Sequence, residues 1–361
     1  MNPHKKLPLM GKAKKAVESV RRLDEGGYMY YMECCHDYYS PLIQAPIKLL
    51  GMKKGGCSAF ITRSPDGHVL TGRNYDLPHL DRQGRTTGLN VVLRTSPKGK
   101  YRSVNVADAF WLTALDKNYE AGSLDDGRTD TSWLVFLPYI CMDGMNEKGL
   151  AVSILYLDLK KGETAVKQTV KGRRSVILTM LMRFMLDSCA DFDEAVKLAS
   201  SYNITSTFGK DYHLFVSDAA GNSGVFEWRH DTFTVTRCNC CTNFYVGCDD
   251  AEDCYVDGTL KEKFVRPQEE YDDCSLGYGH GYERFFTLKR TIAAKSGEPL
   301  GQCRSVMDER EARELLHAVA QEYDGGVTSL TQYSAVYDNT ALTLRVEPHQ
   351  EPGEVFAFTV E

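Results

Sequence analysis

The clearest chemical signal in the sequence is a cysteine directly after two glycines, in Gly55-Gly56-Cys57. A cysteine whose nitrogen is part of a peptide bond has no special reactivity. If the Gly56–Cys57 bond is cut, Cys57 gains an α-amine with a pKa of about 7.7–8.0. Nucleophile and base then belong to one residue, as in enzymes that activate Cys or Thr through its own terminal amine. Glycine at position 56 suits this cleavage because it lets the backbone adopt strained or positive-φ geometry at little cost.

This cysteine begins a predicted β-hairpin. Residues 57–63 and 68–74 have the composition of strands, and the Ser-Pro-Asp-Gly sequence between them is typical of a turn. A two-residue turn would place Cys57 opposite either Asn74 or Asp76.

Either register brings Arg73 and Asp76 beside Cys57. Residues three apart on a regular strand point to opposite faces, so we expect a twist or bulge near Tyr75 if both are to reach the site. Arg73 would then favour the thiolate, as an adjacent cation does, and Asp76 would hold the new amine.

These residues resemble the choloylglycine hydrolase and penicillin V acylase family of N-terminal nucleophile amidases. The resemblance rests on Cys57, on Arg73-Asn74-Tyr75-Asp76, and on the spacings of 16 and 19 residues from Cys57 to Arg73 and Asp76. Further motifs follow in the family's order: Asn146-Glu147-Lys148-Gly149-Leu150-Ala151, Tyr212 to Asp218 with Glu227-Trp228 ahead of Thr242-Asn243, Glu283-Arg284-Phe285, and Tyr333 to Asp338.

The resemblance implies an α+β fold, a four-layer αββα sandwich of two antiparallel sheets between helices. It makes Cys57 the nucleophile, with Arg73 and Asp76 orienting it. It also implies that Asn243 donates an amide hydrogen to the oxyanion, that the backbone N–H of Tyr156 is the second donor, and that Arg284 completes the charge network.

The 56 residues before Cys57 set this chain apart from bile salt hydrolases, which lose little more than the initiator Met. A longer released piece is nearer to the isopenicillin acyltransferase and acid ceramidase-like branches. We therefore predict a pro-segment, residues 1–56, removed by autoproteolysis, and a catalytic domain, residues 57–361. The expected substrates are linear non-peptide amides with a hydrophobic acyl group, such as penicillin V-like or fatty acyl amides, with conjugated bile acids less favoured. Acyl transfer to an amine stays open, and no cofactor is expected.

Two alternatives involve other residues. The cysteines of the region 238–274 could form the centre of a metal-binding or thiol protein, but their spacing lacks the paired C-x2-C of structural zinc sites, and no metal is expected. These cysteines are Cys238, Cys240, Cys241, Cys248, Cys254 and Cys274. His213 lies in an alternating strand pattern and is expected to be a packed residue, although it would permit a Cys–His hydrolase that needs no cleavage.

Composition limits the partners and the compartment. The chain has 361 residues and a formal charge of −6, which provides no basic field for nucleic acid. Residues 1–56 are basic, with ten Lys and Arg against five Asp and Glu. There is no signal-peptide pattern and no apolar run near the ~20 residues of a membrane span. We expect a cytoplasmic enzyme with free thiols, a small-molecule amide substrate and no membrane partner; a homo-oligomer, dimer or tetramer, stays open.

The predicted elements follow the order strands, two helices, strands, two helices, strands, which is an α+β pattern and not βαβ alternation. Predicted helices cover 12–23, 175–186, 192–200, 282–295 and 308–323, and predicted strands beyond the hairpin cover 133–137, 150–157, 213–216, 224–228, 232–237, 333–337, 340–346 and 355–360.

Overall fold

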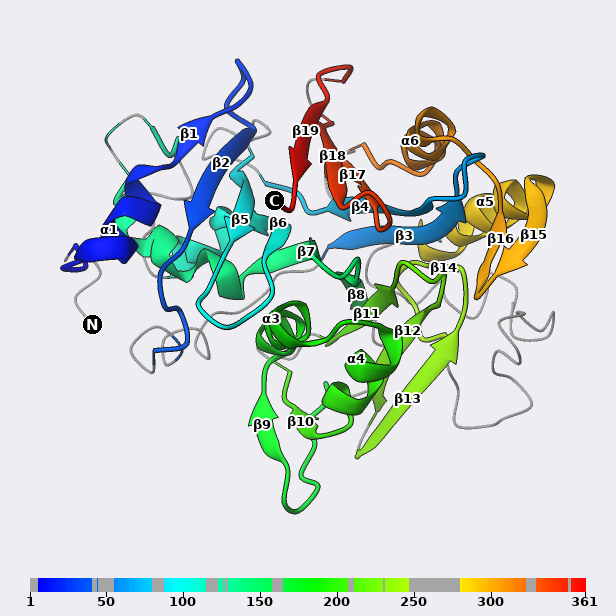
Figure 1. Cartoon of the computed structure of the whole chain (residues 1–361), viewed down its shortest axis with the longest axis horizontal. Helices are drawn as coiled ribbons and strands as arrows, with labels where there is room; N and C mark the ends of the chain where they lie inside the picture. The colour runs from blue at the N-terminus through cyan, green and yellow to red at the C-terminus, as the bar shows by residue number, and fades with distance from the viewer. Residues whose placement is uncertain are drawn as a thin grey trace.

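Two large β-sheets form the centre of the protein (Figure 1). The computed structural model describes residues 6–40, 44, 55–79, 88–114, 123–125, 127, 129–157, 165–206, 211–229, 231–246, 280–322, 329–349 and 352–361. Within this part of the chain, no helix is both long enough and apolar enough to cross a membrane.

The first sheet has nine strands and is antiparallel except for one pair, β2 with β5. Its strands, in spatial order, are β1 (Arg21–Arg22), β2 (Met29–Cys34), β5 (Asn90–Thr95), β6 (Ser103–Asp108), β7 (Cys141–Asn146), β8 (Ala151–Leu157), β11 (Asp211–Ser217), β12 (Ser223–Arg229) and β13 (Thr232–Arg237). Every residue of β7 and β8 is buried, as expected for strands that are covered on both faces.

The second sheet has six strands, and all its pairs are antiparallel. In spatial order they are β14 (Cys240–Cys241), β3 (Gly56–Arg63), β4 (Val69–Asp76), β17 (Thr331–Asp338), β18 (Thr343–Pro348) and β19 (Phe356–Thr359). Two small pairs complete the strands: β9 (Arg174–Val176) with β10 (Tyr202–Ile204), and β15 (Ser296–Leu300) with β16 (Cys303–Ser305).

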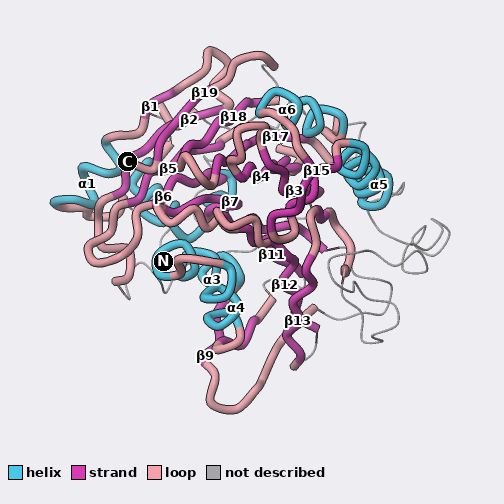
Figure 2. The backbone as a smooth tube through the Cα atoms, turned by 45° about the vertical axis from the view of Figure 1, so that its right-hand side comes forward, coloured by secondary structure: helices cyan, strands magenta, loops and turns pink. Residues whose placement is uncertain are grey.

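Helices cover the outer faces of both sheets (Figure 2). The helices α3 (Leu178–Ser188) and α4 (Phe192–Ala199) pack on the nine-stranded sheet, and α5 (His280–Ala294) and α6 (Glu309–Ala318) pack on the six-stranded sheet. The two sheets face each other where β3 contacts β8. The predicted α+β class, with two stacked sheets between helices, is confirmed.

Local sequence explains where α4 and α6 begin. Asp191 caps α4 by accepting a hydrogen bond from the Glu194 N–H. At the start of α6, Asp308 and Glu311 form a reciprocal capping box. The helix predicted over 12–23 is shorter, because α1 (Gly11–Glu18) ends before β1 begins.

The strand predicted at 133–137 is wrong. This stretch belongs to a 3-10 helix, η3 (Thr131–Tyr139), and η1 (Ala109–Ala114) is of the same type. The apolar run is buried on all sides, and periodicity alone does not distinguish such a run from a buried strand. Pro138 lies inside it and has no N–H for a sheet ladder.

The N-terminal segment, which we predicted to be removed, is built into the nine-stranded sheet. Strand β2 pairs in parallel with β5, and the side chains of Met29, Tyr30 and Met32 are fully buried. The predicted boundary at Gly56 therefore concerns the cleavage of one peptide bond. The parts of the chain before and after this bond belong to the same hydrophobic core.

The same segment covers a buried ion pair on α3. Arg183 and Asp187 lie 2.7 Å apart and are fully buried. The hydroxyls of Tyr38 and Tyr39 donate hydrogen bonds to Asp187 at 3.0 and 2.8 Å. Loss of the segment would leave Asp187 without two donors and would expose the ion pair to water.

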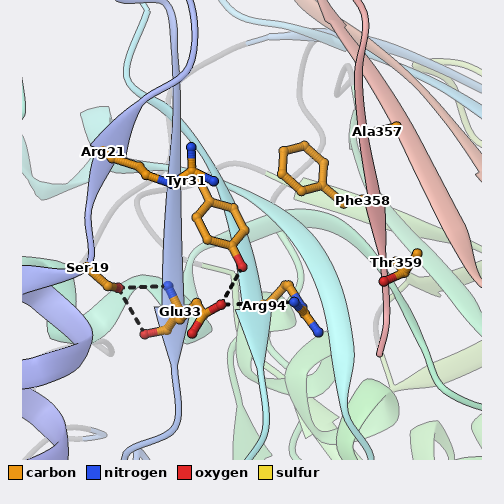
Figure 3. A pocket seen from close by; sticks show the side chains of 8 residues that line it. All are labelled: Ser19, Arg21, Tyr31, Glu33, Arg94, Ala357, Phe358 and Thr359. Atoms are coloured by element: carbon orange, nitrogen blue, oxygen red, sulfur yellow. Dashed lines mark hydrogen bonds and ion pairs between the residues drawn. The ribbon is translucent and has the colours of Figure 1, made fainter.

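Figure 3 shows a third contact, between β2 and the C-terminal strand β19. Tyr31 stacks on Phe358 with ring centroids 5.4 Å apart, and the Arg21 guanidinium carbon lies 4.7 Å from the Tyr31 ring centroid. Strand β2, in the N-terminal segment, is therefore in direct contact with the last strand, β19.

We expect a chain that starts at Cys57 and lacks residues 1–56 to be unable to fold stably. Each large apolar side chain of β2 contributes about 1.5–3 kcal/mol on burial, and a domain's whole stability is only about 5–15 kcal/mol. Thermal unfolding checks this, with co-expressed residues 1–56 as the control that should restore folding. A truncated chain that unfolds at the temperature of the full chain would contradict it.

Candidate active site

Cys57 lies on β3, directly opposite Tyr75 on β4. This register lies between the two that we predicted, because the loop has three residues and not two. The Ser64 N–H bonds to the His68 carbonyl, and Gly67 takes a φ of +94° before the second strand begins.

The hairpin divides the predicted residues between its two faces. Arg73 and Cys57 are on the inner face, where the Arg73 guanidinium reaches the carbonyl of Ile154 on the opposite sheet at 2.5 Å. Asp76 is on the outer face, where it accepts a hydrogen bond from the Gln321 side chain at 2.6 Å. We predicted a twist or bulge near Tyr75, and the ladder of β4 with β17 is irregular there, between Thr331 and Tyr333. Asp76 nevertheless stays on the outer face of the hairpin.

Arg284 of α5 connects Asp76 to the backbone of Cys57. Its Nη1 donates to the Cys57 carbonyl at 2.7 Å and to the Ser58 hydroxyl at 2.6 Å, and lies 3.4 Å from Asp76 Oδ2. Its Nη2 donates to Asn243 Oδ1 at 2.5 Å.

Asn243 contacts the nitrogen that cleavage would convert to an amine. Its Oδ1 accepts the Cys57 N–H at 2.9 Å, and its Nδ2 donates to the Tyr156 carbonyl at 2.7 Å. The Tyr156 ring packs edge-to-face on Tyr212 with centroids 5.6 Å apart. All the predicted site residues, Cys57, Arg73, Asp76, Tyr156, Asn243 and Arg284, thus lie in one buried cluster.

The ladder between β7 and β8 ends at Ser153 of β8. Tyr156 therefore lies on a part of β8 that does not pair with β7. The carbonyls of Ile154 and Tyr156 therefore point at Arg73 and Asn243. In a strand, the N–H and C=O of one residue point the same way, so the Tyr156 N–H is directed to the same edge.

Burial raises the pKa of the Cys57 thiol, and the Arg73 guanidinium opposes part of this rise. Arg73 Nη1 has no hydrogen-bond partner among the described residues. Because Arg73 is fully buried, its charge acts on the thiol through protein and not through water.

Asp143 of β7 was not among the site residues predicted from the sequence. Its carboxylate accepts hydrogen bonds from Arg73 Nε at 3.3 Å and from the hydroxyls of Tyr333 and Tyr337, each at 2.5 Å. Tyr333 and Tyr337 are four residues apart, so they share one face of their strand. This spacing could have indicated a buried polar group that accepts hydrogen bonds from both hydroxyls.

Gly55 and Gly56 pack closely against neighbouring atoms, and Gly55 does so against backbone. A Cβ on Gly56 would lie 2.2 Å from Gln321 Nε2, and one on Gly55 would lie 2.5 Å from the Asp76 carbonyl oxygen. Neither has a positive φ, so the positive-φ geometry that we predicted for glycine at 56 is not found.

The described part of the cysteine cluster is buried. Cys238, Cys240 and Cys241 are free thiols whose pKa values are raised by burial, and Cys248, Cys254 and Cys274 lie outside the described residues. In the part of the chain that the structure describes, no group of three His, Cys, Asp or Glu could hold a metal ion.

Comparisons with known proteins give both a family match and a fold. The family model described as acyl-coenzyme A:6-aminopenicillanic acid acyl-transferase matches residues 138–276, which include Tyr156 and Asn243. No curated protein sequence matches the chain. Two variants of the conjugated bile acid hydrolase from Clostridium perfringens are similar in structure, with TM-scores of 0.52 and 0.51 and 15% identity, covering 84% of this chain and 92% of theirs. The fold is that of the N-terminal nucleophile hydrolases.

The predicted resemblance is confirmed by these matches. A penicillin V acylase from Agrobacterium tumefaciens is also similar, with a TM-score of 0.46 and 15% identity over 84% of this chain and 86% of that one. The family match begins after β3 and β4, so the residues of the hairpin, Cys57 among them, fall outside it.

Proposed function

We propose that this protein is a self-processing cysteine amidohydrolase that cleaves linear, non-peptide N-acyl amides. One observation carries the proposal: Asn243 and Arg284 both bind the backbone of Cys57, and Asn243 accepts its N–H at 2.9 Å. The nitrogen that must become the catalytic amine is thus at the centre of the polar network. The fold, which is similar to that of a conjugated bile acid hydrolase, supports the same activity.

In the uncut chain, the thiol of Cys57 attacks the carbonyl carbon of Gly56, and the acyl group moves from nitrogen to sulfur. Water then hydrolyses the thioester, which gives a Gly56 carboxylate, a free thiol and a free α-amine. Because the described part of the N-terminal segment shares the core, the two chains stay together after this step.

In the cut enzyme, the amine of Cys57 takes the thiol proton and the thiolate adds to the substrate carbonyl. Asn243 Nδ2 and the Tyr156 N–H hold the oxyanion. The amine then protonates the leaving nitrogen, and water releases the acid from the thioester. The Tyr156–Tyr212 ring pair next to Asn243 suits an apolar acyl group, such as phenoxyacetyl or a fatty acyl chain.

Hydrolysis is tested by product analysis on three N-acyl amides: phenoxyacetyl, fatty acyl and bile acid conjugates. Thiol-dependent release of free acid would support the proposal, and lack of turnover of all three by cut protein would contradict it. Acyl transfer is the second candidate, because the matching family model is that of an acyltransferase. Added primary amine separates the two, since a transferase would form a new amide.

Replacing Asn243 by alanine should lower kcat by about 100- to 1,000-fold, the loss expected for one oxyanion donor, or ~2.7–4 kcal/mol of barrier. Asn222→Ala is a matched control, because Asn222 bonds Asp218 in a turn between β11 and β12, away from the cluster around Cys57. Steady-state kinetics per cut molecule measures both. An Asn243→Ala enzyme with unchanged kcat would remove Asn243 from the oxyanion site.

A further inference from the structure

Buried side chains from the opposite sheet hold the chain on both sides of Asn243. His213 of β11 lies with Nε2 2.8 Å from the Thr242 carbonyl oxygen. Glu227 of β12 accepts the backbone N–H of Val246 at 2.7 Å. Asn243 lies between these two anchored backbone groups.

The two anchoring side chains also fix each other. His213 Nδ1 lies 3.0 Å from Glu227 Oε1, and both residues are almost completely buried, at 0% and 1% exposed. The ladder of β11 with β12 ends at Leu214 opposite Phe226, and His213 and Glu227 are the next residue of each strand. Because Nδ1 of His213 faces Glu227, Nε2 faces the Thr242 carbonyl oxygen. The Cys241 sulfur lies 3.3 Å from the same Nε2.

The contacts of His213 assign it a role other than that of a base for Cys57. Its described partners are Glu227, the Thr242 carbonyl and Cys241, and Cys57 is not among them. Both ring nitrogens face protein oxygens, so the ring has a fixed orientation.

We propose that His213 and Glu227 are positioning residues for Asn243, acting through the backbone of Thr242 and Val246. Asn243 must place one side chain on three groups, Cys57 N–H, Arg284 and the Tyr156 carbonyl. A shift of about 1 Å in such a group can cost about 100-fold in rate. The inference rests on the proposed function, because it concerns the same oxyanion site.

Two substitutions of His213 test the inference. Both introduce a side-chain amide, but the two amides lie at different distances from the backbone. A glutamine amide can occupy the place of Nε2 and still donate to the Thr242 carbonyl. An asparagine amide can occupy the place of Nδ1 and keep the bond to Glu227, but does not reach Thr242. We expect His213→Gln to keep kcat within about threefold of the wild type, and His213→Asn to lower kcat by about 100-fold with KM little changed.

His36→Asn is the matched control. His36 is a buried histidine at hydrogen-bond distance from a backbone carbonyl, that of Val135 at 3.1 Å, and contacts Cys34. We expect it to change thermal stability without changing kcat per folded, cut molecule. The cut fraction is taken from intact mass for every variant.

A second measurement separates positioning from general destabilisation. In an Asn243→Ala background, His213→Asn should lower kcat no further, because its effect passes through Asn243. Equal kcat for His213→Gln and His213→Asn, or a full further loss in the Asn243→Ala background, would overturn the inference. Wild-type protein that is cut but hydrolyses no amide would instead overturn the proposed function.

Discussion

Replacing Cys57 by alanine should leave the chain uncut and without amidase activity. The substitution removes the sulfur that attacks the Gly56 carbonyl and the nucleophile that attacks the substrate, so both steps fail together. Intact mass under denaturing conditions should give one 361-residue chain for the variant, and two chains separated at Gly56–Cys57 for the wild type. Release of free acid from an N-acyl amide should be undetectable for the variant.

Cys240→Ala is the matched control for this experiment. Cys240 is a buried free thiol on β14, beside β3, and pairs with Phe60, whose side chain is on the face away from Cys57. We expect this variant to be cut and active. A fully active wild-type preparation with an intact Gly56–Cys57 bond would contradict the mechanism and would favour a Cys–His hydrolase that needs no cleavage.

The structure brings together the residues that the local motifs named, and whether they act as predicted stays a prediction. Cys57 and Arg73 share a hairpin, whose pairing is set within twenty residues. Asn243 and Arg284 were located by motif alone, and the structure brings both to the Cys57 backbone. The register was off by one residue because the loop has three residues, with Gly67 at φ +94°.

Features that depend on distant pairing could not be predicted. The burial of β2 comes from its parallel ladder with β5, about sixty residues later, and a basic segment before two glycines gives no sign of it. Asp143 is a single acid in an ordinary strand, and its partner Arg73 belongs to the other sheet. Arg73 and Asp143 come together only because the two sheets stack on each other.

This buried pair leads to the second large effect, which we expect from Asp143→Ala. The substitution would leave the Arg73 charge in a fully buried place without its carboxylate, which costs about 3–5 kcal/mol of the free energy of unfolding. It would also remove the acceptor of two buried tyrosine hydroxyls. Arg73 would lose the bond that directs it toward Cys57, so we expect activity per folded molecule to fall as well.

Asp187→Ala provides a closely matched control, because Asp187 also binds a buried arginine, Arg183, and two tyrosine hydroxyls. It lies on α3, outside the cluster around Cys57. Denaturant unfolding should show a comparable loss of stability for both variants, while kinetics per folded, cut molecule should show a loss only for Asp143→Ala. If both variants keep wild-type kcat once folded, Asp143 stabilises the core without directing Arg73. The distinction matters physically, because the pKa of the Cys57 thiol, already raised by burial, depends on Arg73 remaining beside it.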